Sequence, residues 1–522
     1  MLNTSAQEEQ IQEQVDAIRK GKRNPSVIVI GAGMTGILMV IKLREAGITN
    51  VTILEKTANI GGTWRENTYP GVACDVPAHM YTYSFEPNPG WSHFFAEGAE
   101  IQQYFEHVAN KYGVMNSVRF NEAVTDARFK NGKWWVKTSK GAALEADFLV
   151  AATGILHHPA YPDIEGLDSF KGEMFHTARW NHDVEIGPNT KVGVIGTGST
   201  AAQFIPELVK TGAQVNVFQR TPQWLLPLPN FEISEKAKKR LKNSPFLTAL
   251  ARKTSIAFLE HFFTKAVTGH KVQRWLLETA CKLNLRISIK DKVLRDKLTP
   301  NYRVGCKRVV INKTFYNGIQ QPNAHLITEG IKRITEKGIV TKDANGNEQE
   351  HELDVLVLST GFNPFNFMRP MNMIGREELH IDDAWSERIK AYRSLMLPNY
   401  PNFFLMLGPN TPIGNFSVIA MSEVQTDWVI KLMDRWRQGE YDEVEAPWES
   451  VNQFNAYVKE GLQGTAWVGG CQSWYLDADG DPILWPYTWQ RWVDEMAEPK
   501  MQDLMTRQNE TISQPTAAAE VV

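Results

Sequence analysis

Short apolar runs alternate with helix-length amphipathic stretches along most of this chain. The run over 26–31 is almost entirely Val and Ile, and a second run over 51–55 ends in an acid. Continuous apolar runs of this length favour parallel strands that are buried on both faces. The residues between them, through Leu43, have a helical pattern. The pattern therefore predicts an α/β fold built from βαβ units.

The same succession recurs in the middle of the chain. Strands are predicted over 191–196 and 214–220, and the apolar strands over 146–154 and 352–361 both end in Thr-Gly. This internal repeat predicts two related Rossmann-like domains, the second inserted in the first. Further strands are expected over 134–138, 324–328, 339–340 and 401–407, and helices over 101–114 and 417–436.

Residues Glu232 to Thr299 break this alternation. They have a helical and basic pattern without strand runs, which predicts a helical insertion within the second domain. Pro159, Pro162 and Gly166 mark a linker before that domain. The predicted organisation is an N-terminal arm (1–25), a discontinuous first domain (26–157 and 372–500), a second domain (158–228 and 303–371), its helical insertion (229–302) and a flexible tail (501–522).

Composition narrows the function classes. The chain has 522 residues and a net charge of −3, so no basic excess predicts a nucleic-acid partner. The basic run over 236–242 is interpreted as a solvated helix face. The longest apolar stretch, 27–41, is shorter than a membrane span and contains three glycines, and the N-terminus lacks a signal-peptide pattern. We expect a cytoplasmic enzyme without a membrane partner, as a monomer or small homo-oligomer.

The four cysteines do not form a recognisable framework. Cys74, Cys281, Cys306 and Cys471 include no CxxC pair, and no His cluster accompanies them. We therefore predict no disulfide and no metal site, as is usual in a reducing compartment.

A glycine loop follows the first predicted strand. It reads Gly31-Ala-Gly33-Met-Thr-Gly36, and Glu55 ends the next strand 19 residues after Gly36. Strand, glycine loop, helix, strand and acid together form the fingerprint of a dinucleotide site. Gly31 permits the tight turn, Gly33 lets the backbone approach a pyrophosphate, and Gly36 permits close packing of the helix. Glu55 is expected to bind ribose hydroxyls, so the loop suits FAD.

The second glycine loop indicates a different dinucleotide cofactor. It reads Gly196-Thr-Gly198-Ser-Thr-Ala201, and its next strand ends in Arg220-Thr221. A guanidinium at this place favours the 2′-phosphate of NADP through charge-assisted hydrogen bonds. We predict an NADPH site that contains Gly196, Thr197, Gly198, Ser199, Thr200, Arg220 and Thr221.

The segment Gly61–Asp75, GGTWRENTYPGVACD, combines turn formers with aromatic side chains and closes on a carboxylate. A rigid turn with an aromatic wall is suited to placing a large flat ring beside a charged group. We expect this segment to shape the flavin site.

Residues 170–181 lie between the two domains and read FKGEMFHTARWN. Phe170, Gly172, His176 and Trp180 match the FxGxxxHxxxW fingerprint of Baeyer–Villiger monooxygenases. Together with Gly61–Asp75, Cys306-Lys-Arg308, Leu358–Phe362 and Ser473-Trp-Tyr475, the chain resembles these class B flavoproteins over roughly residues 26–490. It departs from the family at Asn181, where Pro or Asp is usual, and at Ser359, which replaces Ala.

The resemblance implies an FAD- and NADPH-dependent monooxygenase. NADPH would reduce FAD, and a C4a-peroxyflavin formed with O2 would attack a ketone to give an ester or lactone, with sulfoxidation as a side activity. Arg308 would stabilise the anionic peroxide and adduct because it stays protonated, and Asp75 would orient it.

The resemblance also implies roles for the other matching positions. Lys307 would hold the 2′-phosphate with Arg220, Trp474 would contact the nicotinamide ribose, and His176 and Trp180 would couple domain movement. Further FAD contacts are expected at Gly62, Thr63, Trp64, Asp75, Tyr81 and Val124.

Alternatives share this scaffold. Flavin N- and S-oxygenases carry Tyr in place of Trp180, and a flavoprotein redox sensor without turnover is a third reading. Pyridine-nucleotide disulfide reductases need a redox-active cysteine pair near the flavin, which the spacing does not provide. Cyclic, linear and aryl ketones all stay open as substrates. Residues 410–416 and 474–485 are expected to shape the substrate pocket.

Overall fold

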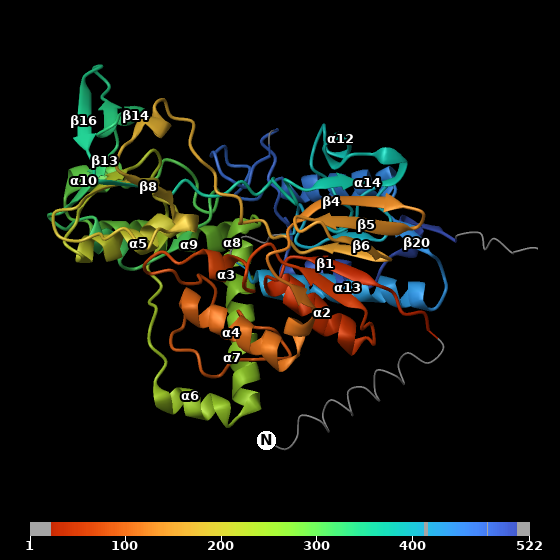
Figure 1. Cartoon of the computed structure of the whole chain (residues 1–522). Helices are drawn as coiled ribbons and strands as arrows, with labels where there is room; N and C mark the ends of the chain where they lie inside the picture. The colour runs from red at the N-terminus through yellow and green to blue at the C-terminus, as the bar shows by residue number, and fades with distance from the viewer. Residues whose placement is uncertain (1–21, 412–415, 478, 509–522) are drawn as a thin grey trace, which may run out of the picture.

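The computed structural model describes residues 22–411, 416–477 and 479–508. A parallel sheet in the order β19-β7-β1-β2-β3 forms its first unit. Every residue of β1 and β7 is buried, which explains their unbroken apolar sequences. In Figure 1, α2 and α13 lie below this sheet and β4–β6 above it. The elements are β1 (Val27–Ile30), α2 (Met34–Glu45), β2 (Val51–Leu54), β3 (Val118–Arg119), β7 (Phe148–Ala151), β19 (Phe403–Leu405) and α13 (Val418–Arg437).

A second parallel sheet repeats the plan in the order β13-β10-β9-β17-β8. It lies on the left of Figure 1. Its elements are β8 (Glu173–His176), β9 (Lys191–Ile195), α5 (Ser199–Lys210), β10 (Gln214–Phe218), β13 (Ala324–Ile327) and β17 (Val355–Leu358). The predicted α/β class with two nucleotide-binding units is confirmed by these two sheets.

The similarity of the two units includes a three-stranded antiparallel meander that precedes one central strand of each parallel sheet. The first meander precedes β7 and the second precedes β17. The strands are β4 (Val124–Lys130), β5 (Lys133–Thr138) and β6 (Ala143–Ala146), and then β14 (Gly330–Ile334), β15 (Gly338–Lys342) and β16 (Glu348–Glu352).

After β17 the chain returns to the first unit. β18 (Asn372–Ile374) pairs with β4, and β19 pairs with β7. The predicted helix over 417–436 is α13. The predicted helix over 101–114 is α4 (Gly98–Lys111), which begins and ends three residues earlier. The remaining helices of this part are α3 (Thr63–Glu66), α12 (Ile381–Ala384), α14 (Trp448–Leu462) and α15 (Trp489–Glu495).

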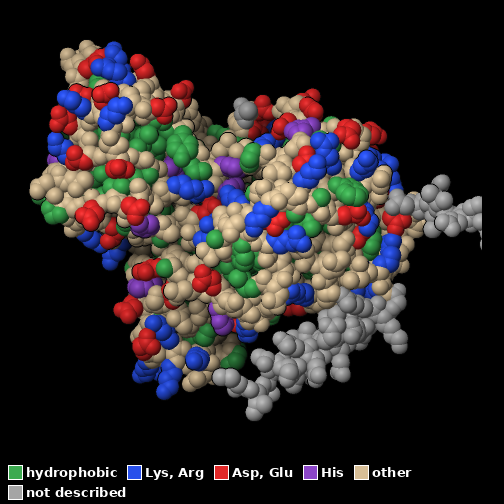
Figure 2. Space-filling view, in the orientation of Figure 1, with side chains coloured by type: hydrophobic (Ala, Val, Ile, Leu, Met, Phe, Trp, Pro, Cys, Tyr) green, Lys and Arg blue, Asp and Glu red, His purple; other side chains and the backbone are tan. Residues whose placement is uncertain are grey.

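The helical insertion begins and ends at one place. The two-residue strands β11 (Leu225–Leu226) and β12 (Val310–Ile311) pair in parallel across its base. Between them the helices are α6 (Glu235–Lys242), α7 (Pro245–Phe258), a π-helical turn (Leu259–Thr264), α8 (Lys265–Val267), α9 (Lys271–Ser288) and α10 (Lys292–Lys297). The short α11 (Phe315–Gly318) follows β12. Basic side chains gather over α6 in Figure 2, as predicted for a solvated face.

Both ends of the described chain make defined contacts with the first unit. Residues 501–507 are ordered, because β21 (Met505–Arg507) pairs antiparallel with β20 (Glu443–Glu445) and Tyr392 donates to Asp503 at 2.8 Å. Residues 1–21 and 509–522 lie outside the described residues. At the other end of the arm, Lys22 forms an ion pair with Asp434 of α13 at 2.8 Å. These short polar segments have no sequence pattern that indicates such contacts, because the contacts depend on the surface of the first unit against which each segment packs.

Candidate active site

The first glycine loop connects the end of β1 to α2. Gly31 has a φ of +101°, and a Cβ at Gly36 would lie 2.0 Å from the Gly31 carbonyl oxygen. The loop therefore has no room for a side chain at Gly36, as predicted. The buried Glu55 carboxylate accepts from the Ala32 N–H at 2.9 Å and from the Thr57 N–H at 3.0 Å. Glu55 thus holds the loop itself, and its contact with a ribose stays a prediction.

A second glycine turn faces this loop. The Gly61 N–H donates to the Ala32 carbonyl at 2.9 Å, and a Cβ at Gly62 would lie 3.1 Å from Gly33 Cα. Backbone without side chains thus borders the N-terminus of α2 from two sides. Such a cradle fits a pyrophosphate, because backbone N–H groups and the helix dipole favour negative charge there.

The aromatic wall predicted after this turn is present. Trp64, on α3 after Thr63, donates from Nε1 to the Tyr81 hydroxyl at 3.1 Å, and the two rings meet edge to face at 5.6 Å. Tyr81 is buried. Val124 is a buried residue at the start of β4, packed in the cluster that contains Ile30 and Leu54.

Asp75 and Arg308 meet at the close of this segment. Arg308 Nε donates to Asp75 Oδ2 at 2.8 Å and Nη2 donates to Oδ1 at 2.6 Å, a bidentate pair. Burial alone would lower the pKa of Arg308. The nearby Asp75 carboxylate raises it by more, so the pKa lies above the ordinary value of an arginine. The residues are 233 apart in sequence, and the fold brings them together as predicted.

Tyr475 completes the surroundings of Arg308. Burial raises the pKa of this tyrosine to about 12, although the nearby Arg308 charge lowers it. The Trp474 ring packs 4.3 Å from the Tyr475 ring and is 36% exposed. The Ser-Trp-Tyr match pointed to this turn, but only the structure shows that Tyr475 lies close to Arg308.

The second glycine loop has the same form as the first. Gly196 has a φ of +110°, and its Cβ would lie 2.3 Å from the Ser359 carbonyl oxygen, whereas a Cβ at Gly198 would meet no atom within 4 Å. Gly198 caps α5, whose first residues are Ser199 and Thr200. Open space at this helix N-terminus fits a phosphate group.

Two cations lie beside this loop. Lys307 and Arg220 are close enough that burial, and then the Arg220 charge, lower the pKa of Lys307. Neither forms an ion pair within the described part of the chain. Thr197 Oγ1 donates to the Thr221 carbonyl at 3.2 Å, which fixes the turn after Arg220. An anion would relieve the repulsion between these cations.

The prediction of no disulfide is wrong. Cys306 and Cys471 form a disulfide with a Cα–Cα distance of 6.2 Å. A pair separated by 165 residues without a local motif could not be recognised from spacing. Cys74 and Cys281 are buried free thiols. Among the described residues, no three His, Cys, Asp or Glu side chains gather where they could hold a metal ion.

The linker motif lies at the junction of the two units. Phe170 is buried, and a Cβ at Gly172 would lie 2.6 Å from the Phe170 ring. His176 ends β8, and its Nδ1 accepts from the Ala178 N–H at 3.1 Å. Burial lowers the pKa of His176 to about 4, so the imidazole is neutral near pH 7. Trp180 packs edge to face on Phe204 of α5 at 5.5 Å.

Further contacts across this junction were missed from sequence. Gln203 of α5 accepts from the Tyr69 hydroxyl at 2.9 Å and donates to the Ala73 carbonyl at 3.0 Å. Arg179 Nη1 lies 3.4 Å from Glu66 Oε2. Glutamine and arginine on a helix or turn are common surface residues, so no sequence signal separates these contacts from solvated side chains.

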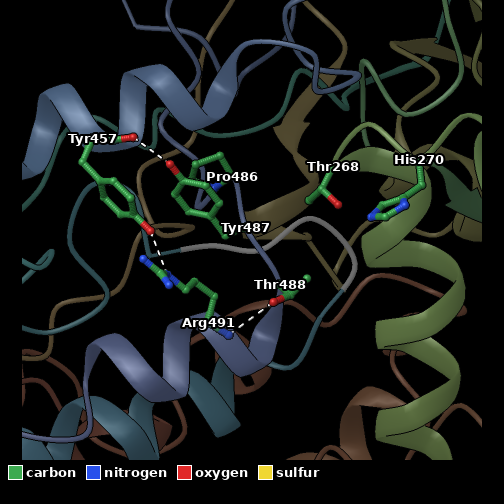
Figure 3. A pocket seen from close by; sticks show the side chains of 7 residues that line it. All are labelled: Thr268, His270, Tyr457, Pro486, Tyr487, Thr488 and Arg491. Carbon is green, nitrogen blue, oxygen red and sulfur yellow. Dashed lines mark hydrogen bonds between the residues drawn. The ribbon is translucent and has the colours of Figure 1, made fainter.

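A pocket of about 420 Å³ lies where the insertion meets the C-terminal part of the chain (Figure 3). Tyr457 of α14 accepts at its hydroxyl from Arg491 Nε at 3.0 Å and stacks on Tyr487 at 4.7 Å. One part of the pocket lining, Pro486 to Thr488, directly follows the predicted pocket loop 474–485, and the lining contains none of the predicted cofactor residues. The lining residues are Thr268, His270, Tyr457, Pro486, Tyr487, Thr488 and Arg491.

Comparison with known proteins places this geometry in a family. The protein-family model described as pyridine nucleotide-disulphide oxidoreductase matches residues 28–273 of this chain. An uncharacterized monooxygenase of Mycobacterium tuberculosis is 43% identical over 89% of this chain and 92% of its own. A Baeyer–Villiger monooxygenase of Streptomyces coelicolor is 36% identical over 88% of this chain and 89% of its own.

The chain belongs to the Baeyer–Villiger monooxygenases. The solved structure of OTEMO in complex with FAD and NADP superimposes on this monooxygenase with a TM-score of 0.82 at 27% identity, covering 93% of this chain and 100% of that one. The resemblance predicted from the sequence is thereby confirmed. No helix in the described part of this monooxygenase has both the length and the apolar character needed to cross a membrane.

Proposed function

We propose that this Baeyer–Villiger monooxygenase inserts one oxygen atom beside the carbonyl of a small ketone, with Arg308 as the charge-stabilising residue and Asp75 as its positioning partner. The enzyme uses FAD, NADPH and O2, as its family does. The observation that carries the assignment of roles is the bidentate Asp75–Arg308 pair next to the aromatic turn. When bound and reduced, the flavin supplies the activated oxygen.

Arg308 suits this role because its charge is permanent and its direction is fixed. Two hydrogen bonds to one carboxylate restrict the guanidinium, so little reorganisation is needed when negative charge develops beside it. Asp75 leaves three of the five guanidinium N–H groups unused, and of these the ones that do not face Tyr475 could donate to an oxyanion. Asp75 keeps the pair nearly neutral before the reaction begins.

The two glycine cradles would hold the cofactors. Gly31, Gly33, Gly36 and Gly62 would surround the FAD pyrophosphate, with Glu55 holding the loop in shape. Thr63, Trp64, Tyr81 and Val124 would line the rest of the flavin site. The open space at Gly198 supports a pyrophosphate of NADP there, with Gly196, Thr197, Ser199 and Thr200 around it.

Lys307 and Arg220, with Thr221, would bind the NADP 2′-phosphate. The repulsion between Lys307 and Arg220 supports this, because a doubly charged phosphate would compensate both cations. Trp474, being partly exposed beside Tyr475, would contact the nicotinamide ribose.

Phe170, Gly172, His176 and Trp180 would couple the two units rather than touch substrate. His176 is buried at a strand end and Trp180 packs on α5. A cytoplasmic location, the absence of nucleic-acid and membrane partners, and a monomeric or small homo-oligomeric state also stay predictions.

Product analysis tests the function. Purified protein is supplied with FAD, NADPH and air and with cyclic ketones, aryl-alkyl ketones and a thioether. Esters or lactones with one added oxygen support the proposal and begin a substrate map. Sulfoxide as the sole product would favour the S-oxygenase alternative, and a protein that consumes no NADPH contradicts the proposal.

A further inference from the structure

The Cys306–Cys471 disulfide joins two segments of the proposed active site. Cys306 lies two residues before Arg308, at the exit of the helical insertion. Cys471 lies three residues before Trp474 and four before Tyr475. The bridge therefore links the chain that carries the catalytic guanidinium to the turn that packs beside it.

The turn has few other attachments near the bridge. Residues 467–473 lie in a segment without helix or strand, between α14 and the isolated bridge of Leu476 with Pro482. Within the described chain, their backbone hydrogen bonds to other residues are local, from the Gly469 N–H to the Ala466 carbonyl at 3.2 Å and from the Leu476 N–H to the Ser473 carbonyl at 3.1 Å. The Trp467 carbonyl also contacts a distant residue, at 3.9 Å from Cys306 Sγ. The nearest backbone hydrogen bond to the insertion is from Ala466 N to Val267 O at 2.8 Å.

The bridge itself is well enclosed. Cys306 is 1% exposed and Cys471 is 8% exposed. Gly469 packs against Cys306, because a Cβ there would lie 3.5 Å from its sulfur. In an irregular segment of this kind, a covalent link restricts the backbone between the buried side chains of Trp467 and Tyr475.

We propose that the Cys306–Cys471 disulfide is a positioning device for the reaction, which holds the turn of Trp474 and Tyr475 against Arg308. This inference rests on the proposed function of Arg308 and Trp474. A small-molecule thiol opens the bridge in a balanced exchange: two RSH give up two protons and two electrons, Cys306 and Cys471 become thiols, and RSSR is released. In the opened enzyme both glycine cradles are kept, but the turn of Trp474 and Tyr475 is no longer held in place against Arg308.

The expected consequence is loss of coupling rather than loss of flavin. A displaced turn admits water to the site, and NADPH oxidation then yields hydrogen peroxide in place of ester. We expect the peroxide fraction to rise several-fold and the KM for NADPH to rise about threefold to tenfold when the bridge is open. FAD absorbance should be unchanged.

The first measurement establishes the bridge independently of activity. Holoenzyme purified without reductant is denatured, alkylated with iodoacetamide and digested. Alkylation of Cys74 and Cys281 alone, together with a linked peptide containing Cys306 and Cys471, is expected. Four alkylated cysteines would overturn the proposal, whatever the enzyme catalyses.

The second measurement compares coupling in four samples. These are oxidised holoenzyme, dithiothreitol-treated holoenzyme, the same sample reoxidised with oxidised glutathione, and the double variant C306S/C471S. The variant C281A is the matched control, since Cys281 is a buried thiol of α9 that the site does not use. Reversible loss of coupling in the opened wild type supports the proposal even if the double variant does not fold.

Two results would count against it. Equal peroxide fractions and KM values in the oxidised and opened enzyme would show that the bridge does not position the turn. Equal loss of coupling in C281A would show a general effect of core disturbance. If oxidised wild type forms no ester from any ketone, the proposed function fails while the alkylation result still reports on the bridge.

Discussion

Arg308 is held by a single carboxylate that fixes both its charge and its direction. The two hydrogen bonds use one edge of the guanidinium, at 2.8 and 2.6 Å, and leave the other N–H groups unused by Asp75. A lysine ammonium cannot reproduce this planar arrangement, because it is a point charge on a flexible stem. The chemistry at this position therefore depends on geometry as much as on charge.

Replacing Arg308 should separate these contributions. Arg308→Ala is expected to lower kcat for ester formation by about 10²- to 10³-fold, as when an oxyanion donor is removed. Arg308→Lys should retain only a small part of the kcat that is lost in Arg308→Ala. Steady-state rates with product quantification measure the effect, and the exposed Arg286→Ala serves as control. Wild-type kcat in a flavin-loaded Arg308→Ala protein would refute the catalytic role.

The neutral state of His176 has a consequence for pH dependence. Its pKa is lowered to about 4 in the folded protein, compared with about 6.5 in an unfolded chain. Above about pH 6.5 both states are neutral, so the full stability is present. As pH falls from 6.5 to 4, the unfolded state binds the proton first and stability is lost.

We expect this loss to reach on the order of 3 kcal/mol for the one group. Melting temperatures of wild type and His176→Gln, taken between pH 7.5 and 4.5, should converge as the pH falls. The exposed His325→Gln is the control. A constant difference between wild type and His176→Gln across this range would contradict the lowered pKa.

Two helices begin at glycine loops, and the space around each glycine differs. A Cβ at Gly36 would collide with the Gly31 carbonyl at 2.0 Å, but a Cβ at Gly198 would meet nothing within 4 Å. One glycine is thus required by the protein's own packing. The other is required only if a ligand occupies the open space.

This difference gives a paired prediction. Gly36→Ala should displace α2 from its loop and yield protein without bound flavin. Gly198→Ala should fold and keep FAD, but its KM for NADPH should rise about tenfold because the methyl group obstructs the cofactor. Absorbance near 450 nm and NADPH titrations report the two effects. An unchanged KM for NADPH in Gly198→Ala would show that NADP does not bind at this loop.

At the scale of the whole molecule, the C-terminal residues close the first unit. β21 pairs with β20, whose Glu443 and Glu445 are buried, and Asp503 accepts from Tyr392. A chain ending at residue 500 loses these contacts. A chain ending at residue 508 keeps every contact described.

We expect the chain ending at residue 500 to melt about 2–5 °C below wild type, since each lost hydrogen bond contributes about 1 kcal/mol. The chain ending at residue 508 should melt like wild type. Thermal scans of both flavin-loaded proteins make the comparison. Equal melting of the two truncated chains would show that β21 adds no stability.

The parallel sheets could be predicted because Val and Ile runs followed by glycine loops leave few alternatives. The Asp75–Arg308 pair could be predicted only through family motifs, since nothing local in either segment specifies the other. Cys306 and Cys471 could not be paired, and β21 could not be recognised in the predicted tail. Both depend on surfaces that exist only after the chain has folded.

The pairing of β11 with β12 closes the insertion at its base, so that about eighty residues leave and re-enter the second unit at adjacent points. A segment attached in this way is separated in sequence from both glycine loops. Arg308 lies two residues before β12, at the point where the insertion rejoins the second unit. Variation among the inserted helices would therefore reshape access to the reacting centre while the guanidinium stays anchored, which gives natural selection a route to new ketones on an unchanged redox core.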